Sequence, residues 1–178
     1  MEVAGIRPVC LNVCKTLADD ATVIRDATRD DVNAITEIWH QGWRDAHLGL
    51  VPDDLARLRT RENFHGRAST LLAQTRVAQK DDVIGFCICK ADELYQMYVA
   101  RAGRGFGIAQ LLMTDAENRF VGAGVNEAWL ACAIGNKRAM RFYENSGWTS
   151  TGAQTVELDT SAGSFELEVL KYVKRFRL

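Results

Sequence analysis

Hydrophobic residues recur at helical spacing over the first part of the chain that has a clear pattern. A short apolar run at residues 22–27 predicts a first strand, and the apolar positions from Val32 to Trp39 then share one face of a helix. Pro52 suits the first turn of a second, short helix, because its missing N–H would have no intrahelical partner there. A third helical pattern covers residues 62–74. One strand followed by three helices is therefore predicted for this part.

The hydrophobic period changes after residue 75. Residues 76–79, 83–89 and 94–99 predict three successive strands in an antiparallel meander. A glycine-rich turn leads into an amphipathic helix from Ile108 onwards, and Gly122 and Gly124 end it. A strand at residues 128–133, a helix at 136–146 and two strands joined near 161–164 complete the pattern.

These elements predict an α+β fold in the order β-α-α-α-β-β-β-α-β-α-β-β. We expect a central mixed sheet of about seven strands, mostly antiparallel, flanked by about four to five helices. Residues 1–21 show no clear period and are interpreted as an N-terminal arm or extension, so residues 22–178 form the predicted domain. A length of 178 residues and a hydrophobic content of 47% are typical of one globular domain.

Charge and composition exclude several classes of partner. The 22 Lys and Arg residues against 23 Asp and Glu residues leave no basic field for nucleic acid or an anionic membrane. No apolar window reaches the ~18 residues of a membrane span and no secretory signal is evident, so we expect a cytoplasmic protein. The odd number of cysteines, 5, favours reduced thiols, and the 3 histidines show no ligand spacing, so no metal is predicted.

The turn between the meander and the next helix could hold an anion. In this position backbone N–H groups lack intrahelical partners, and the helix dipole places partial positive charge beside them. Gly105 and Gly107 would let a phosphate approach the main chain, with Arg104 adding a charged contact. A tight turn that needs glycine only for its dihedral angles remains an equal alternative. The turn lacks the Gly-Lys-Ser/Thr ending of a Walker phosphate loop. It also lacks the Gly-x-Gly-x-x-Gly spacing of a dinucleotide-binding turn.

The turn and two segments around it resemble motifs of the GNAT superfamily of acetyl-CoA-dependent N-acetyltransferases. The superfamily signature Gln/Arg-x-x-Gly-x-Gly/Ala is matched by Arg104-x-x-Gly107-x-Ala109. The residues before the turn resemble the family's preceding strand, and a later segment resembles its Asn-x-x-Ala-x-x-Phe-Tyr motif, here Asn136, Ala139, Phe142 and Tyr143. The likeness extends from about Thr22 to Lys174.

The resemblance implies a binding site for acetyl-CoA. Its pyrophosphate is expected on the backbone amides of the turn, and its pantetheine arm beside the end of the preceding strand, where two strands separate. Asn136 is expected to contact the pantetheine, although capping the helix that begins there would also explain this residue. The expected cofactor residues are Met97, Tyr98, Val99, Arg104, Gly105, Phe106, Gly107, Ile108, Ala109 and Asn136.

Acetyl transfer to an amine requires a base for the amine and an acid for the departing thiolate. The resemblance implies that Tyr143 is the acid near the sulfur and that Glu93 is the base. A carboxylate of ordinary pKa is a poor base, so burial, a water relay or His47 would have to contribute. Core packing for Tyr143 and an exposed strand-end charge for Glu93 are the structural alternatives.

Residues 43–52 resemble a subgroup pattern, Trp-x-x-Ala-Tyr-x-Gly-x-x-Pro, in which His47 replaces the usual tyrosine. Trp43 and His47 are four residues apart, so on a helix they would share a face and could line an acceptor pocket. An imidazole there could change the acceptor preference or supply a second base. Simple packing of both side chains is the alternative.

The resemblance thus implies an N-acetyltransferase that moves acetyl from acetyl-CoA to a primary amine of a small molecule or peptide. The amine would attack directly in a ternary complex, through a tetrahedral intermediate, because no cysteine is clearly placed to form an acyl-enzyme. A non-catalytic acyl-CoA-binding sensor or regulatory module is the alternative function. Exposed strand edges near the C-terminus could pair two chains as a homodimer.

Overall fold

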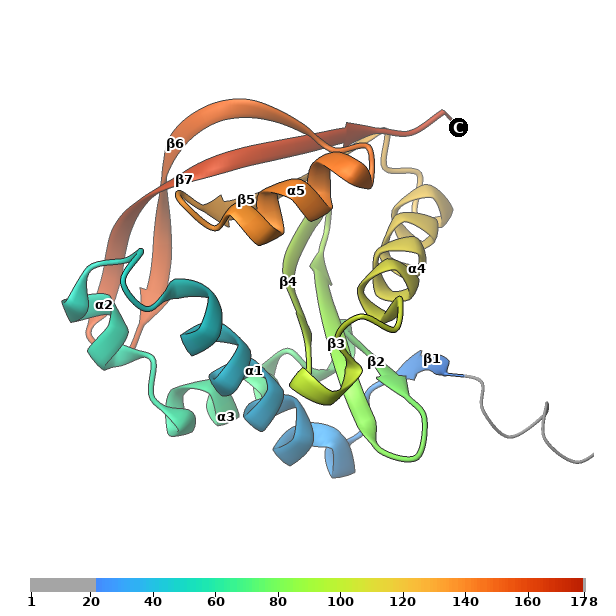
Figure 1. Ribbon diagram of the computed structural model, residues 1–178, viewed down its shortest axis with the longest axis horizontal. Helices are drawn as coiled ribbons and strands as arrows, with labels where there is room; N and C mark the ends of the chain where they lie inside the picture. The colour runs from blue at the N-terminus through green and yellow to red at the C-terminus, as the bar shows by residue number, and fades with distance from the viewer. Residues whose placement is uncertain (1–21, 178) are drawn as a thin grey trace, which may run out of the picture.

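The protein is built around one seven-stranded sheet with the strand order β1-β2-β3-β4-β5-β7-β6 (Figure 1). The computed structural model describes residues 22–177, so the predicted N-terminal arm lies outside the described residues. The predicted α+β class and the order of strands and helices are confirmed. The strands are β1 (Val23–Asp26), β2 (Thr75–Gln79), β3 (Val83–Lys90), β4 (Glu93–Val99), β5 (Glu127–Ala133), β6 (Thr149–Thr160) and β7 (Gly163–Arg175).

The helices cover both faces of the sheet (Figure 1). They are α1 (Val32–His47), α2 (Asp53–Leu58), α3 (Arg61–Thr70), α4 (Ile108–Gly122) and α5 (Lys137–Asn145). The predicted helix at 62–74 is shorter than expected, because α3 ends at Thr70 and a separate 3-10 turn, Leu72–Gln74, leads into β2. Apolar side chains of α1 and α3 pack on one face, and those of α4 and α5 on the other.

The sheet is split between its only two parallel neighbours in the described chain, β4 and β5. These strands share a single register pair, Glu93 with Trp129, and no further pairing follows. All other neighbouring strands are antiparallel, and β5 pairs with β7 over seven residue pairs. The ends of β4 and β5 beyond this pair therefore have free space between them.

A bulge in β4 changes which side chains face each side of the sheet. The pairing of β3 with β4 passes from Cys89–Leu94 directly to Ile88–Gln96, so Tyr95 is the extra residue. Leu94 packs with the α4 face of the core, whereas Tyr95 and Tyr98 pack with the α1 face. The bulge thus directs a cluster of polar aromatic side chains toward α1.

A glycine within α1 makes room for one of these side chains. A Cβ added at Gly42 would lie 2.6 Å from Cδ1 of Tyr98, far inside van der Waals contact. Glycine costs ~1 kcal/mol relative to alanine in a helix, so its position here is explained by the approach of this ring. The contact fixes Tyr98 against α1.

Among the described residues the outer strand β6 pairs only with β7, so its other edge has no partner strand there. The homodimer suggested from this region stays a prediction. The described cysteines, Cys87, Cys89 and Cys132, are free and buried, and all three lie in the same core cluster.

Candidate active site

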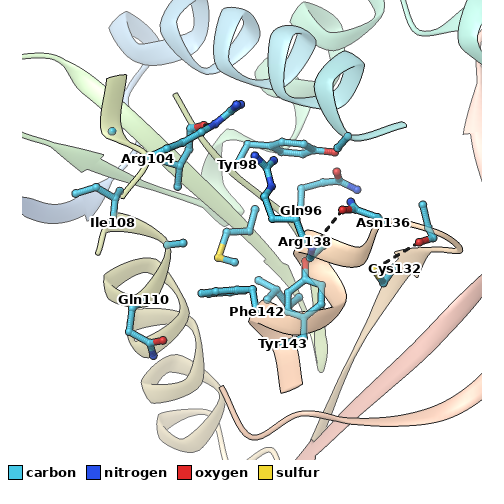
Figure 2. A pocket seen from close by; sticks show the side chains of 18 of the residues that line it. Gln96, Tyr98, Arg104, Ile108, Gln110, Cys132, Asn136, Arg138, Phe142 and Tyr143 are labelled. Atoms are coloured by element: carbon cyan, nitrogen blue, oxygen red, sulfur yellow. Dashed lines mark hydrogen bonds between the residues drawn. The ribbon is translucent and has the colours of Figure 1, made fainter. Parts of the chain in front are cut away.

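A cavity of about 450 Å³ occupies the space where β4 and β5 separate (Figure 2). Its walls come from the end of β4, the glycine turn, the start of α4, the end of β5 and α5. We call it the cofactor-side cavity. Of the residues predicted for acetyl-CoA, its lining includes Met97, Tyr98, Val99, Arg104, Gly105, Gly107, Ile108, Ala109 and Asn136.

The glycine turn presents unpaired main-chain donors to this cavity. Gly105 and Gly107 have φ angles of 86° and 78°, in the left-handed region that favours glycine. The first hydrogen bond at the start of α4 is donated by the amide of Leu111 to the carbonyl of Gly107. The three preceding amides, from Ile108 to Gln110, donate to no protein atom of the described chain, so they are available to an anion.

The side chain of Arg104 is held by another residue. Its Nη2 donates to Asp45 on α1 at 2.9 Å and its Nε to the carbonyl of Val99 at 3.3 Å. Asp45 also accepts two hydrogen bonds from Arg101, and Arg101 and Arg104 together hold the pKa of Asp45 far below its usual range. Arg104 therefore ties the turn to α1.

Phe106 differs from the other residues predicted in the turn. Its side chain is 77% exposed and does not line the cavity. Among residues that the sequence reasoning missed, Arg138 on α5 lines the cavity and has no ion-pair partner in the described chain. Gln96 and Gln110 were missed as well and also line it, together with Phe142 of the Asn-x-x-Ala-x-x-Phe-Tyr motif (Figure 2). The positions of Arg138, Gln96 and Gln110 depend on the bulge and on helix packing, which carry no simple motif.

Asn136 caps α5 and also lines the cofactor-side cavity. Its Oδ1 accepts a hydrogen bond from the amide of Ala139 at 3.2 Å, so it caps α5. The residue also lines the cofactor-side cavity and is only partly buried. The cap leaves the amide nitrogen of the side chain without a protein partner in the described residues, so it can still donate into the cavity.

Tyr143 lines the same cavity from α5 (Figure 2). Its ring packs against Phe142 and Tyr172 at centroid distances of 5.7 and 5.8 Å. Burial raises the pKa of the Tyr143 phenol well above its ordinary value, so the hydroxyl keeps its proton at neutral pH. Within the described chain, the hydroxyl has no hydrogen-bond partner and is free to donate to a group in the cavity.

Glu93 and Trp43 line a second cavity, of about 310 Å³, on the α1 side of the sheet. We call it the acceptor-side cavity. Burial raises the pKa of Glu93, while the positive charge of Lys90 opposes this shift. A raised pKa makes this carboxylate a stronger base than an exposed glutamate.

His47 stacks on Trp43 with a centroid distance of 5.0 Å and an angle of 13° between the rings. Its Nδ1 lies 3.0 Å from the carbonyl oxygen of Trp43, and because a carbonyl only accepts, Nδ1 carries the proton. Burial lowers the pKa of His47, which favours the neutral ring. Nε2 is then a proton acceptor, as a second base would require.

The two cavities meet in the gap of the sheet. Six residues line both of them: His47, Tyr95, Gln96, Tyr98, Ala131 and Ala133. Molecules bound in the two cavities would therefore lie side by side at these residues. Such proximity is what a transfer between two bound molecules requires.

Two further features of the described chain bear on the chemistry. Burial raises the pKa of the Cys132 thiol to about 11, which disfavours the thiolate needed for an acyl-enzyme. Between residues 22 and 177 no group of three or more His, Cys, Asp or Glu side chains could hold a metal ion, and none of the helices there is long and apolar enough to cross a membrane.

The structure combines a split mixed sheet with a turn whose backbone amides are unpaired within the described chain, beside the split. The family model described as acetyltransferase (GNAT) family matches residues 32–148, which is well over half of the chain. The chain therefore belongs to the GNAT acetyltransferase family, and the resemblance inferred from its motifs is confirmed.

Solved structures of several acetyltransferases share the fold of this chain. The chain is similar to a GCN5-related N-acetyltransferase from Rhodopseudomonas palustris, with a TM-score of 0.69, 15% identity and coverage of 91% of this chain and 100% of that one. It is also similar to the PaiA N-acetyltransferase of Thermoplasma acidophilum in complex with coenzyme A (TM-score 0.61, 19% identity, coverage 88% and 99%). A third is YncA, a putative acetyltransferase from Salmonella typhimurium with its cofactor acetyl-CoA (TM-score 0.64, 18% identity, coverage 88% and 94%).

Proposed function

We propose that this protein transfers an acetyl group from acetyl-CoA directly to a primary amine. The observation that carries the proposal is the junction of the two cavities, one with free main-chain donors and one with titratable side chains. Such a junction allows both substrates to be bound at once, so no covalent enzyme intermediate is needed. Membership of an acetyltransferase family supports the same reaction.

The residues of the cofactor-side cavity fit acetyl-CoA. The amides of Ile108, Ala109 and Gln110 are unpaired donors at a helix start, as a pyrophosphate requires. Arg138 can add a cationic contact to a phosphate, whereas Arg104 is already bound to Asp45. When bound, acetyl-CoA supplies the activated acetyl group as a thioester. Structures of neighbours that hold CoA or acetyl-CoA support this assignment.

Glu93 is proposed as the group that accepts the proton from the amine, directly or through one water. Its raised pKa suits this role, and its place at the start of β4 borders the acceptor-side cavity. His47 is neutral, lines both cavities and presents Nε2 as an acceptor, so it is the second base. Trp43 holds the imidazole ring by stacking.

Tyr143 is proposed as the proton donor to the departing thiolate. A phenol with a raised pKa is a weak acid, but it can hydrogen-bond a developing negative charge strongly in a cavity that excludes water. Its unpartnered hydroxyl satisfies the first requirement for this role.

Thiol release from acetyl-CoA with a panel of amines and peptides tests the function, and a thermal-shift titration with CoA runs in parallel. Amine-dependent thiol release together with the acetylated amine, identified by mass spectrometry, is the expected result. Stabilisation by CoA without transfer to any amine would instead favour the non-catalytic sensor. No stabilisation by CoA would contradict the assignment of the cofactor-side cavity.

A further inference from the structure

A buried arginine without a carboxylate partner lines the acceptor-side cavity. Arg59 follows α2 directly and is 4% exposed. Its Nη1 donates to the carbonyl oxygen of Asp159 at 3.0 Å and to Oδ1 of Asn63 at 3.3 Å. Its Nε and Nη2 donate to no protein atom between residues 22 and 177, and no carboxylate there lies within ion-pair distance. A buried guanidinium normally has such a partner.

Arg67 on α3 lines the same cavity and increases the local positive charge. Its Nη2 donates to the hydroxyl of Tyr95 at 2.6 Å, and its guanidinium lies 4.5 Å from the centroid of the Trp39 ring. These contacts fix the side chain but do not neutralise it. Burial and the charge of Arg67 lower the pKa of Arg59 to about 10, although Tyr95, Tyr98 and the carboxylate of Asp159 oppose part of this shift.

Carboxylates also line this cavity, but none forms an ion pair with either arginine. Glu157 and Asp159 belong to β6, where they are exposed while the alternating Val156 and Leu158 are partly buried. This alternation places both carboxylates on the outer face of the strand. Asp159 therefore meets Arg59 through its main-chain carbonyl.

Three other partly buried arginines of the described chain have carboxylate partners. Arg25 pairs with Asp31 at 2.6 Å, Arg76 with Asp115 at 3.1 Å and Arg104 with Asp45 at 2.9 Å. Arg119 on α4 is an exception, because it forms no ion pair with a described residue and its buried Nη1 has no hydrogen-bond partner there. Arg59 and Arg67 differ from Arg119 because they line a cavity, where a bound anion can reach them.

We propose that Arg59 and Arg67 bind a carboxylate of the acceptor, so that the acceptor is an amine that also carries a carboxylate. The planar guanidinium of Arg59 has donors left for such an oxyanion, and charge-assisted hydrogen bonds of this type are strong. The proposal rests on the proposed function, because the amine would be acetylated in the same cavity.

Matched acceptors test the proposal in the wild-type protein. Leucine and phenylalanine are each compared with their primary amides and with the amines that lack the carboxyl group, at one pH and ionic strength. The expected kcat/KM is at least about 30-fold higher for the acids, in line with a charged hydrogen bond in a buried site. Dipeptides, whose carboxylate is farther from the amine, distinguish a free amino acid from a peptide terminus.

Substitutions then locate the effect. Arg67→Gln and Arg59→Gln are each expected to lower the kcat/KM for the acids about 30-fold while changing that for the amides less than about 3-fold. Arg57→Gln, which removes an exposed arginine of α2, is the matched control and keeps the preference for acids. Because Arg59 also ties α2 to β6, its variant could fail to fold, and the Arg67 variant then carries the test alone.

A binding measurement separates failure of this proposal from failure of the proposed function. The N-acetyl amino acid and its amide are titrated calorimetrically into protein saturated with CoA, which requires no turnover. Tighter binding of the acid that Arg67→Gln abolishes supports the anion site even if no amine is acetylated. Equal turnover and equal binding of acids and amides would overturn the anion site and leave the transferase intact. Absence of both turnover and acid-dependent binding would overturn both.

Discussion

The two cavities of this protein are built in different ways. The phosphate-binding part proposed for the cofactor-side cavity takes its donors from the main chain of one continuous turn, with Gly105 and Gly107 allowing the conformation. The acceptor-side cavity takes its polar groups from side chains of α1, α3, β3, β4 and the segment between α2 and α3. The first can bind the same phosphate group whatever side chains surround it, whereas single substitutions can alter the second.

This difference predicts that substitutions on the two sides change different kinetic constants. Substitutions at the glycine turn should raise the Kd of CoA, whereas substitutions at Glu93 should lower kcat without changing the Kd of CoA. If both kinds of substitution changed both constants equally, the two cavities would not have separate roles.

The largest effect is expected for Glu93→Gln, which removes the proposed base with little change in size. We expect kcat to fall about 10²- to 10³-fold, as for loss of a general base, while the Kd of CoA changes less than twofold. Stopped assays and calorimetry measure the two quantities. Glu127→Gln, at an exposed carboxylate paired with Arg175, is the control. A fall in kcat below threefold would transfer the role to His47.

Tyr143→Phe is expected to lower kcat about 10- to 100-fold without weakening CoA binding, because only the donor to the thiolate is lost. The matched substitution is Tyr172→Phe, in which the lost hydroxyl donates to Glu144 in the wild type. That variant should lose about 1 kcal/mol of stability and keep its activity. Equal kcat values for the two variants would remove Tyr143 from the mechanism.

Gly107→Ala should weaken CoA binding about tenfold, because alanine costs ~1–2 kcal/mol in the left-handed conformation that the turn requires. Nothing lies within 4 Å of the added Cβ, so the effect is conformational. Gly124→Ala is a close control, since Gly124 also has a positive φ and open space but lies beyond the far end of α4. Both variants should lose similar stability, and only the first should lose affinity.

Gly42→Ala should destabilise the protein by about 1–2 kcal/mol despite the higher helix propensity of alanine, because the new methyl group displaces Tyr98. Gly66→Ala, on an exposed position of α3 with nothing within 4 Å, should instead stabilise by up to ~1 kcal/mol. Denaturant unfolding measures both. If Gly42→Ala also raised the free energy of unfolding, the ring of Tyr98 would have moved aside at no cost, which would contradict this prediction.

The smallest effect concerns pH. Because the pKa of His47 is lowered in the folded state, the unfolded chain binds a proton more readily, and the free energy of unfolding falls as pH drops below about 6.5. His47→Phe keeps a ring for stacking and removes this contribution. Unfolding at pH 7 and pH 5 should show a smaller loss for the variant than for the wild type, and parallel losses would contradict the shift.

Local patterns in the sequence predicted the parts of the site that are made locally. The turn from Arg104 to Ala109 has its conformation, its free amides and its position before a helix within a few residues, so its motif was sufficient. The cap formed by Asn136 is equally local. The order of helices and strands could be predicted for the same reason, because the spacing of hydrophobic residues within a segment indicates whether that segment is a helix or a strand.

Features that depend on contacts distant in sequence could not be predicted in this way. Arg59 has no motif, and its carbonyl partner at Asp159 lies 100 residues away. The hydrogen bond from Arg104 to Asp45 could not be predicted, because it depends on how close α1 lies to the glycine turn. The place of Gly42 within α1 is explained only by the ring of Tyr98, which lies 56 residues further along the chain and packs against it. The bulge at Tyr95 likewise depends on pairing with β3.

The single register pair between β4 and β5 has a mechanical consequence. Two ladders of well-paired strands meet at Glu93 and Trp129 alone, so this point is a natural pivot between two stiff halves. A small rotation about it would widen or narrow the gap at the far ends of the strands, with the greatest displacement near Val99 and little at Glu93. Glu93, the proposed base, would thus stay in place while the gap between the far ends of the strands changes in width.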